Sequence, residues 1–347
     1  MHTSLKSILF LLCAFSWSTA PAVVDNPDKL GIVTGSEAGT YIKFGQDMAA
    51  LTEQYGLSLL VKDSEGSLDN IRRLISKENA AVGIVQSDVL GFLTRSQDER
   101  MRRVASLLRL VFPFYNEEVH LYAHKNIQSF DDLAGKRVVV GTKGSGNWLT
   151  TTNLLHMMGV EPAERMNLSP PEGVTAVLTG KADAMIYVAG KPVKLFSNIE
   201  QLKNNPKYGD LVKNVHFVPL DDPKMLKEYL PAKLTPQDYG WIEQEVPTIA
   251  VKAVLVSFDF SRKLTPYYER RCRELGLLGT AIRSNLALLR GNGHPKWNEV
   301  DLEQDVGLWK ADTCSKMEVV RSKPKRSDPD DFLIKELETC VRTGTCE

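Results

Sequence analysis

Beyond its first residues, this sequence lacks any long hydrophobic run. No stretch after residue 22 approaches the roughly 20 consecutive apolar residues that a membrane-spanning helix needs. The sequence also lacks an excess of charge of one sign, because 43 Lys and Arg residues balance 43 Asp and Glu residues. Such a chain has no overall field to attract nucleic acid or an anionic membrane surface, so a small neutral or zwitterionic partner fits better.

Motifs of catalysis are missing as well. The sequence contains no G-x-S-x-G, no H-E-x-x-H and no phosphate-binding P-loop. Its histidines have no metal-ligand spacing; His120 and His124 are four apart, but on the strand predicted for this segment they would be about 13 Å from each other. We therefore expect no enzyme, no metal and no cofactor.

Cysteines are few. Of the five, Cys13 falls in the apolar N-terminal run, and an even number remains. In an exported chain this predicts two disulfides, and four cysteines allow three pairings. A metal site is the rival interpretation, but there is no C-x-x-C spacing. We favour Cys272 with Cys314 and Cys340 with Cys346.

The N-terminal segment predicts export. Lys6 precedes an apolar run over residues 8–15, and small residues follow. This is the pattern of a secretory signal peptide (residues 1–22), with cleavage near Ala20 or Ala22. An uncleaved anchor would need a longer apolar run. We expect a soluble periplasmic protein.

The stretch Gly31–Tyr41 reads as a strand, a Gly/Ser loop and the start of a helix. Apolar residues fill the strand, and Tyr41, Phe44, Met48 and Leu51 recur at helical spacing after the loop. The loop therefore lies at a helix N-terminus, where free N–H groups favour an anionic ligand group. The alternative is that Gly39 and Thr40 only cap the helix.

The same alternation continues to residue 88. Apolar strands are predicted over residues 57–61 and 81–85, with a helix over residues 68–75 between them. Continuously apolar strands favour a parallel sheet covered on both faces. Right-handed crossovers then bring the loops Asp63–Ser67 and Gln86–Asp88 to the same edge as the first loop.

A second copy of this pattern follows. Strands are predicted over residues 118–123, 137–140 and 184–188, and the loop 141–148 leads into a helix. Gly39 and Gly66 are 27 residues apart, as are Gly146 and Gly173. The chain therefore predicts two α/β lobes with a ligand cleft between their facing loop edges.

A return strand over residues 246–257 and a helix over residues 272–289 complete the predicted order. We assign residues 23–118 with 252–300 to lobe one, and residues 119–251 to lobe two. Hinges are expected near Glu118 and Val251. Residues 301–347 form a cysteine-bearing extension packed on lobe one, in which the charged run 321–331 is a surface loop.

An ordered series of short motifs over residues 28–300 resembles the TAXI family, the solute-binding proteins of TRAP (tripartite ATP-independent periplasmic) transporters. The motifs are Gly-Thr-Tyr at 39–41, Gly66-Ser67 before Asn70-Ile71, Gly-Ile-Val-Gln-Ser-Asp at 83–88, Leu133-Ala-Gly-Lys136, Val140-Gly141, Gly144-Ser-Gly146, Gly190-Lys-Pro192 and Pro247-Thr-Ile-Ala250. The resemblance implies a type II periplasmic-binding-protein fold that closes on glutamate, glutamine, 2-oxoglutarate or a related carboxylate. It also implies delivery to an ion-coupled membrane permease.

Two loops depart from the family pattern. In the first, Ala38 precedes Gly39 where paired glycines are usual before Thr-Tyr, and Glu37 is charged; in the second, Lys143 stands where a proline or another small residue is usual. Glu37 either repels a ligand carboxylate or pairs with a ligand amine, and Lys143 attracts an anion. Equally, both are solvated loop charges.

The candidate ligand contacts come from the loops of both lobes and from the return strand. They are Ser36, Gly39, Thr40, Tyr41, Gly66, Ser67, Gln86, Ser87, Asp88, Ser145, Gly146, Asn147, Trp148, Tyr187, Ala189, Gly190 and Thr248. Tyr41 and Tyr187 either contact the solute or belong to the core, whereas Trp297 and Trp309 are expected to pack.

We therefore predict a monomeric solute receptor that works with a membrane permease. The runner-up is a binding protein that presents its ligand to a membrane sensor, since both roles need the same closed cleft. An enzyme on the same fold is the third alternative.

Overall fold

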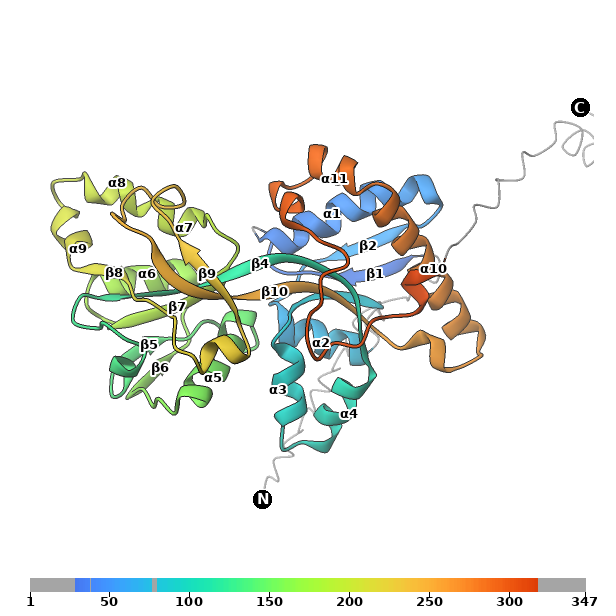
Figure 1. Ribbon diagram of the computed structural model, residues 1–347, viewed down its shortest axis with the longest axis horizontal. Helices are drawn as coiled ribbons and strands as arrows, with labels where there is room; N and C mark the ends of the chain where they lie inside the picture. The colour runs from blue at the N-terminus through green and yellow to red at the C-terminus, as the bar shows by residue number, and fades with distance from the viewer. Residues whose placement is uncertain (1–28, 38, 77–79, 318–347) are drawn as a thin grey trace, which may run out of the picture.

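The computed structural model describes residues 29–37, 39–76 and 80–317. The predicted signal peptide, the charged run 321–331 and the predicted Cys340–Cys346 pair lie outside these residues. Figure 1 shows two lobes side by side, joined by two long strands that run through both.

Lobe one contains the first predicted βαβαβ unit. Its parallel strands are β1 (Leu30–Val33), β2 (Leu59–Lys62) and β3 (Val82–Gln86), and its helices are α1 (Thr40–Thr52), α2 (Ser67–Ser76), α3 (Val89–Arg95) and α4 (Glu99–Leu107). Every residue of β1 and β3 is buried. The apolar face predicted for α1, which includes Phe44 and Met48, is buried in the core. Gly45 allows α1 to approach the sheet, because a Cβ there would lie 2.8 Å from a methyl of Thr34.

The crossing strands are β4 (Leu108–His124) and β10 (Val246–Phe258), which pair antiparallel. Their ladder extends to Glu118 opposite Ala250, and from Glu118 onward the other edge of β4 pairs with β7 of lobe two. On the other side, β10 pairs with β3 of lobe one. The predicted strand over 118–123 is therefore only the second half of β4, whose first half continues the apolar run back to Leu108.

Lobe two repeats the arrangement. Its parallel strands are β5 (Arg137–Val139), β6 (Glu164–Met166) and β7 (Ala184–Ala189), flanked by α5 (Gly146–Met158) and α6 (Pro170–Leu178). Two short strands, β8 (Val215–Phe217) and β9 (Leu230–Leu234), pair antiparallel with β4 and β10. Three short helices follow β7: α7 (Lys194–Ser197), then α8 (Ile199–Lys203) and α9 (Gly209–Lys213), which lie towards the far end of lobe two (Figure 1). One mixed sheet in the order β2-β1-β3-β10-β4-β7-β5-β6 thus runs through both lobes.

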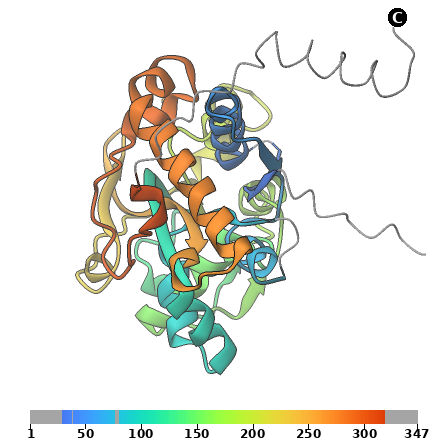
Figure 2. The same ribbon diagram turned by 90° about the vertical axis from the view of Figure 1, so that its right-hand side faces the viewer.

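The predicted single helix over residues 272–289 is wrong in extent. Helix α10 (Pro266–Ser284) begins earlier, where the Thr265 side chain caps a helix that opens with proline. It ends at Asn285, whose amide donates to the Tyr55 hydroxyl (2.6 Å), and α11 (Leu286–Asn292) follows. Seen from the lobe-one end of the molecule, α10 runs across lobe one (Figure 2).

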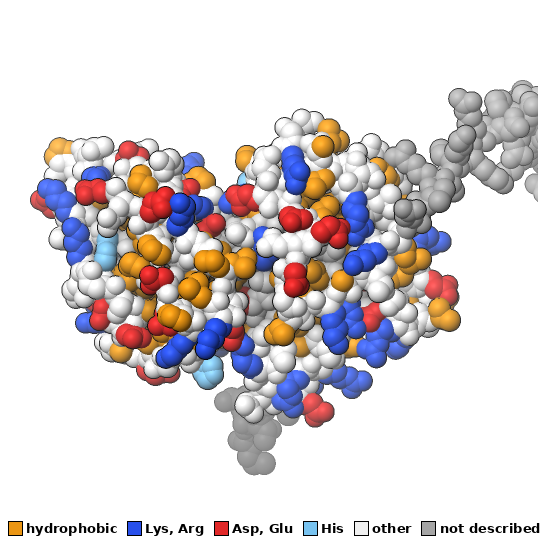
Figure 3. Space-filling model, in the orientation of Figure 1, with side chains coloured by type: hydrophobic (Ala, Val, Ile, Leu, Met, Phe, Trp, Pro, Cys, Tyr) orange, Lys and Arg blue, Asp and Glu red, His pale blue; other side chains and the backbone are white. Residues whose placement is uncertain are grey.

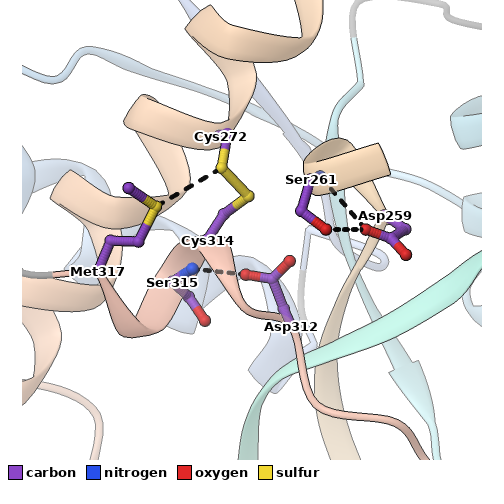
Figure 4. Close-up of a disulfide and its surroundings, with 7 residues drawn as sticks. All are labelled: Asp259, Ser261, Cys272, Asp312, Cys314, Ser315 and Met317. Carbon is purple, nitrogen blue, oxygen red and sulfur yellow. Dashed lines mark hydrogen bonds between the residues drawn. A yellow bond between two sulfur atoms is a disulfide. The ribbon is translucent and has the colours of Figure 1, made fainter. Parts of the chain in front are cut away.

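After α11, residues 293–316 form a segment that we call the C-terminal strap. It includes the short 3₁₀ helices η5 (Pro295–Glu299) and η6 (Cys314–Lys316). Trp297 is fully buried and stacks on Phe44 with ring centroids 4.2 Å apart, as its predicted packing role requires. The predicted Cys272–Cys314 disulfide is confirmed and fixes the end of the strap to α10 (Figure 4).

Candidate functional site

The lobe-one loops predicted to bind a ligand lie together at the carboxyl edge of the parallel strands. The Ser64 N–H donates to the Gly35 carbonyl (3.2 Å), which joins the loops after β1 and β2. The Ser67 hydroxyl accepts the Gln86 N–H (3.0 Å), which joins the loops after β2 and β3. The structure therefore brings these three loops to one place.

The lobe-two loop ends at the N-terminus of α5. The Ser145 hydroxyl caps this helix by accepting the Trp148 N–H (3.2 Å). The Asn147 side chain accepts the Val188 N–H (2.7 Å) and so ties the loop to β7. These two polar side chains are committed to holding the loop in position.

The two lobes touch where these loops meet. Gly66 of lobe one is so close to Gly146 that an added Cβ would lie 3.4 Å from the Gly146 nitrogen. A Cβ on Gly146 would collide with the side-chain amide of Gln86, with its carbonyl carbon 2.6 Å away. Glycine at residue 146 is therefore what permits this approach of α5 to lobe one.

Three hydrogen bonds cross this interface, one of them buried and two partly buried. The Thr150 hydroxyl of α5 donates to Gln86 Oε1 at 3.2 Å. Asp88 Oδ2 accepts two more from lobe two, from the Asn153 amide and from the Tyr229 hydroxyl, each at 3.2 Å. The predicted residues Gln86 and Asp88 thus bridge the lobes, through partners that the sequence alone did not indicate.

The rim of the interface adds weaker contacts. Arg95 of α3 and Glu228 of lobe two form an ion pair at 3.2 Å, and both side chains are about half exposed. Such a pair contributes little because water and salt screen it. Phe92 and Trp148 meet edge to face across the rim with ring centroids 6.3 Å apart. Figure 3 shows a surface notch between the lobes above this region.

Several predicted residues serve the framework instead. Ser87 exchanges hydrogen bonds with the Lys252 backbone (2.8 and 3.1 Å). The Thr248 hydroxyl donates to the Val119 carbonyl between the crossing strands. Gly39 is the N-cap residue of α1 and provides no side-chain cap, while Thr40 is the first residue of that helix.

Other predicted residues lie at the surface or at the edge of lobe two. Ser36, Glu37 and Lys143 are exposed, which agrees with solvated loop charges at the last two positions. Ala189 pairs with Glu118 in the β4–β7 ladder. Gly190, Glu37 and Lys143 form none of the hydrogen bonds that cross the interface between the described parts of the lobes.

The two candidate tyrosines differ. Tyr41 is buried, and its hydroxyl donates to Glu117 Oε2 at 2.9 Å. Tyr187 is only partly buried and packs edge to face on Phe196, with ring centroids 5.9 Å apart. Burial raises the pKa of Tyr187 to about 12, so its hydroxyl stays protonated.

Sequence reasoning missed Glu117 as a site residue. Glu117 and Glu118 lie where β4 passes between the lobes, and they are only 6% and 4% exposed. Burial raises the pKa of Glu117 to about 7, although the hydrogen bond from Tyr41 and the nearby Gln86 amide act in the opposite direction. An acidic pair inside a strand that is mostly buried and apolar was the signal in the sequence.

Asp88 is a second buried acid beside the interface. Burial raises its pKa to about 6, opposed by the nearby Thr150 hydroxyl and by the hydrogen bonds from Asn153 and Tyr229, all of lobe two. Its other oxygen, Oδ1, is buried and accepts no hydrogen bond from the described residues. The interface therefore holds two carboxyl groups that titrate near neutral pH.

The C-terminal strap also contacts both lobes. The Trp309 indole N–H donates to the Ser87 carbonyl (2.8 Å) in lobe one. The Lys296 side chain packs on Gly190 of lobe two, where an added Cβ would lie 2.7 Å from Cε. The Lys296 ammonium is paired with Glu299 at 2.6 Å. The strap thus covers the crossing strands at the hinge.

Other features give no second site. A hollow of about 340 Å³ on lobe two contains none of the interface residues; it is lined by residues 128–131, Met158, residues 219–223 and Met225. Among the described residues, no three His, Cys, Asp or Glu side chains are grouped to hold a metal ion. In the same residues, no helix has the length and apolar character of a membrane span.

Comparisons with known proteins gave a family match and similar solved structures. A family model described as the NMT1-like family matches residues 32–261. The chain is similar to the arginine-, lysine-, histidine-binding protein ArtJ of Geobacillus stearothermophilus (15% identity, 77% of this chain and 96% of that one, TM-score 0.40). It is also similar to a substrate-binding protein of an ABC uptake transporter from Streptococcus pneumoniae with bound histidine (12% identity, 76% of this chain and 89% of that one, TM-score 0.41). A histidine kinase sensor domain is similar as well (11% identity, 79% of this chain and 97% of that one, TM-score 0.44). The family match and the two-lobed sheet together confirm the predicted periplasmic-binding-protein-like α/β fold.

Proposed function

The chain belongs to the NMT1-like family, and we propose that it is an extracytoplasmic solute receptor. In this proposal, a small amino acid or carboxylate, similar to glutamate or 2-oxoglutarate, binds between the two lobes. Hinge closure buries the solute, and no chemistry follows. Residues 1–22 direct export to the periplasm, and the closed monomer delivers its solute to a TRAP-type membrane permease.

The observation that carries this proposal is the buried polar bridge between the lobes. Gln86 and Asp88 follow a strand of lobe one, and Thr150, Asn153 and Tyr229 meet them from lobe two. Buried polar groups of this kind are costly unless they are satisfied. An interface built only for stability would be more apolar, so this one is suited to exchanging its hydrogen bonds with those of a polar solute.

The main chain supports a hinge motion at the same place. It passes between the described parts of the lobes twice, on β4 near Glu118 and on β10 near Ala250. The β4–β10 ladder has register shifts between Lys252 and Val254 and between Leu255 and Val256. Two adjacent strands with local irregularity can twist without breaking the packing of either lobe.

Calorimetry on the full chain tests the proposal. The protein is unfolded and refolded to remove carried-over ligand, then titrated with glutamate, glutamine, 2-oxoglutarate, other dicarboxylates and neutral amino acids. We expect saturable binding of at least one. If none of these compounds binds although circular dichroism shows that the protein has refolded, binding of this solute class is refuted.

A matched pair of variants tests the location. Thr150→Val removes the hydroxyl that donates to Gln86, whereas Thr152→Val removes one that donates to Trp148 within the same helix. We expect T150V to weaken binding by about 2- to 10-fold, as loss of one hydrogen bond predicts, and T152V to leave it unchanged. If T150V and T152V change the affinity equally, the ligand binds at another place. Uptake into vesicles containing a TRAP permease then tests delivery.

A further inference from the structure

Glu117 stands at the point where both lobes and the hinge meet. At the next residue, Glu118, the ladder of β4 with β10 ends and the ladder of β4 with β7 begins on its opposite edge. Tyr41 of α1 donates to the Glu117 carboxylate at 2.9 Å, and the Gln86 side chain of β3 lies close enough to lower the pKa of Glu117. Gln86 in turn accepts from Thr150 of lobe two. A single carboxyl group thus connects the polar residues of lobe one with the bridge to lobe two.

This carboxyl group has no cation of its own. In the part of the chain that the structure describes, no Lys or Arg forms an ion pair with Glu117. Lys296 of the strap is the basic side chain whose charge acts on it, but its ammonium is bound to Glu299 at 2.6 Å. The charge of Glu118 on the same strand acts against ionisation of Glu117. Buried carboxylates are normally paired, so this site is short of positive charge.

A second observation points to a ligand at this place. Tyr115, two residues before Glu117 on β4, is fully buried. Its hydroxyl has no well-aligned hydrogen-bond partner among the described residues, although Thr40 and Glu117 lie close enough to influence its pKa. Asp88 Oδ1 is likewise buried and unpartnered. A group that donates several hydrogen bonds would satisfy these atoms.

We propose that Glu117 is the counter-ion for a protonated amino group of the solute, so that the receptor selects amino acids or amines over oxo acids and simple dicarboxylates. This inference rests on the proposed solute-binding function and adds the chemical class of the solute. A primary ammonium carries three donors and a positive charge, which are the two things that the site lacks. On binding, that cation would exchange water for a fixed carboxylate. Because the site has a low dielectric, the two charges would attract each other more strongly there than in water.

The protonation of Glu117 gives the proposal a pH dependence. Its pKa is raised to about 7 by burial. The titratable and charged groups that act on it or are acted on by it are Tyr41 of α1, Tyr115 and Glu118 of β4, Tyr187 of β7 and Lys296 of the strap. An ammonium ligand favours the carboxylate, so its affinity rises with pH through 7 and its binding releases a proton at pH 6. A carboxylate ligand accepting from a protonated Glu117 would show the opposite dependence.

Matched ligands separate these outcomes on the refolded full chain. Glutamate and 2-oxoglutarate, or alanine and pyruvate, differ by an amino group against a keto group. We expect the amino member of a pair to bind and its oxo partner to bind about 10- to 100-fold more weakly at pH 8, as loss of a charged hydrogen bond predicts. Calorimetry in buffers of different ionisation enthalpy should show proton release at pH 6.

Variants test whether Glu117 causes the preference for amino ligands over oxo ligands. Glu117→Gln should lower amino-ligand affinity by at least 10-fold and abolish the proton release, while Glu117→Asp, which keeps the charge, should retain part of both. Glu243→Gln, at an exposed residue, should match the parent protein. Circular dichroism verifies that each variant is folded.

Two results would overturn the inference. If oxo acids bind as tightly as amino acids, or if E117Q binds amino ligands like the parent protein, the receptor function stands and the assignment of Glu117 fails. If no ligand of either kind binds the refolded parent protein, the proposed function fails and this inference fails with it.

Discussion

Replacing Glu117 by Gln should stabilise the protein at neutral and alkaline pH. The pKa of Glu117 is about 7 in the folded protein, against an ordinary value of 4.5. Between these values the unfolded chain releases a proton that the folded protein retains, so the free energy of unfolding falls as pH rises. The contribution of Glu117 to the free energy of unfolding is fully present below pH 4.5 and is lost above about pH 7. At about 1.4 kcal/mol for each pKa unit, the loss amounts to roughly 3 kcal/mol.

Urea unfolding of the full chain, without added solute, from pH 4.5 to 8 measures this effect. Other buried acids such as Glu118 and Asp88 titrate in the same range, but they are common to both proteins. The difference in free energy of unfolding, E117Q minus parent, should therefore increase by about 3 kcal/mol across the range. E243Q is the control and should show no such trend. A difference that stays constant with pH would refute the assignment of a buried, uncompensated carboxyl group.

Three further substitutions test the interface and the strap. Gly146→Ala places a Cβ against Gln86 and should wedge the lobes apart, weakening solute affinity by about 1 to 3 kcal/mol and increasing the radius of gyration measured by X-ray scattering. Tyr229→Phe removes one hydrogen bond to Asp88 and should weaken affinity in calorimetry by about 0.5 to 1.5 kcal/mol. Cys272→Ser opens a disulfide of sequence separation 42, and chain entropy predicts a loss of about 4 kcal/mol in the free energy of unfolding.

Each of these substitutions has a control. Gly291→Ala meets no atom within 4 Å and should leave scattering and binding unchanged. Tyr208→Phe alters a tyrosine that is 37% exposed and lies outside the described interface contacts, so it should behave like the parent protein. For the disulfide, a reducing agent should lower the stability of the parent but not of the Cys272→Ser variant. A G146A protein that binds and scatters like the parent would contradict the close approach of the lobes.

Local pattern predicted much of the fold because strands such as β1 and β3 are buried on both faces. The apolar run of β3 and the helical spacing of Phe44 and Met48 depend only on nearby residues. The pairing of Cys272 with Cys314 also followed from the sequence, by preference among three pairings. The start of α10 was missed although its signal, Thr265 before a proline, is local.

The bridge between the lobes could not be predicted in the same way. Gln86 and Thr150 are 64 residues apart, and Asp88 and Tyr229 are 141 apart, so no periodicity connects them. The loop motifs indicated which segments approach each other but not which side chains remain free. Ser87 and Thr248 were predicted as ligand contacts, yet their hydroxyls bond to the framework. Only tertiary packing decides such assignments.

The place of β10 in the sheet constrains the order in which the chain can fold. β10 lies between β3 and β4, at the centre of lobe one, but it is made after all the strands of lobe two. During synthesis, lobe two can assemble its parallel strands first, whereas β3 keeps an unpaired edge until residue 258 is available. Unpaired edges invite association with other chains. We therefore expect chains truncated before β10 to aggregate through lobe one, and the late, long-range pairing of β10 to limit the folding rate.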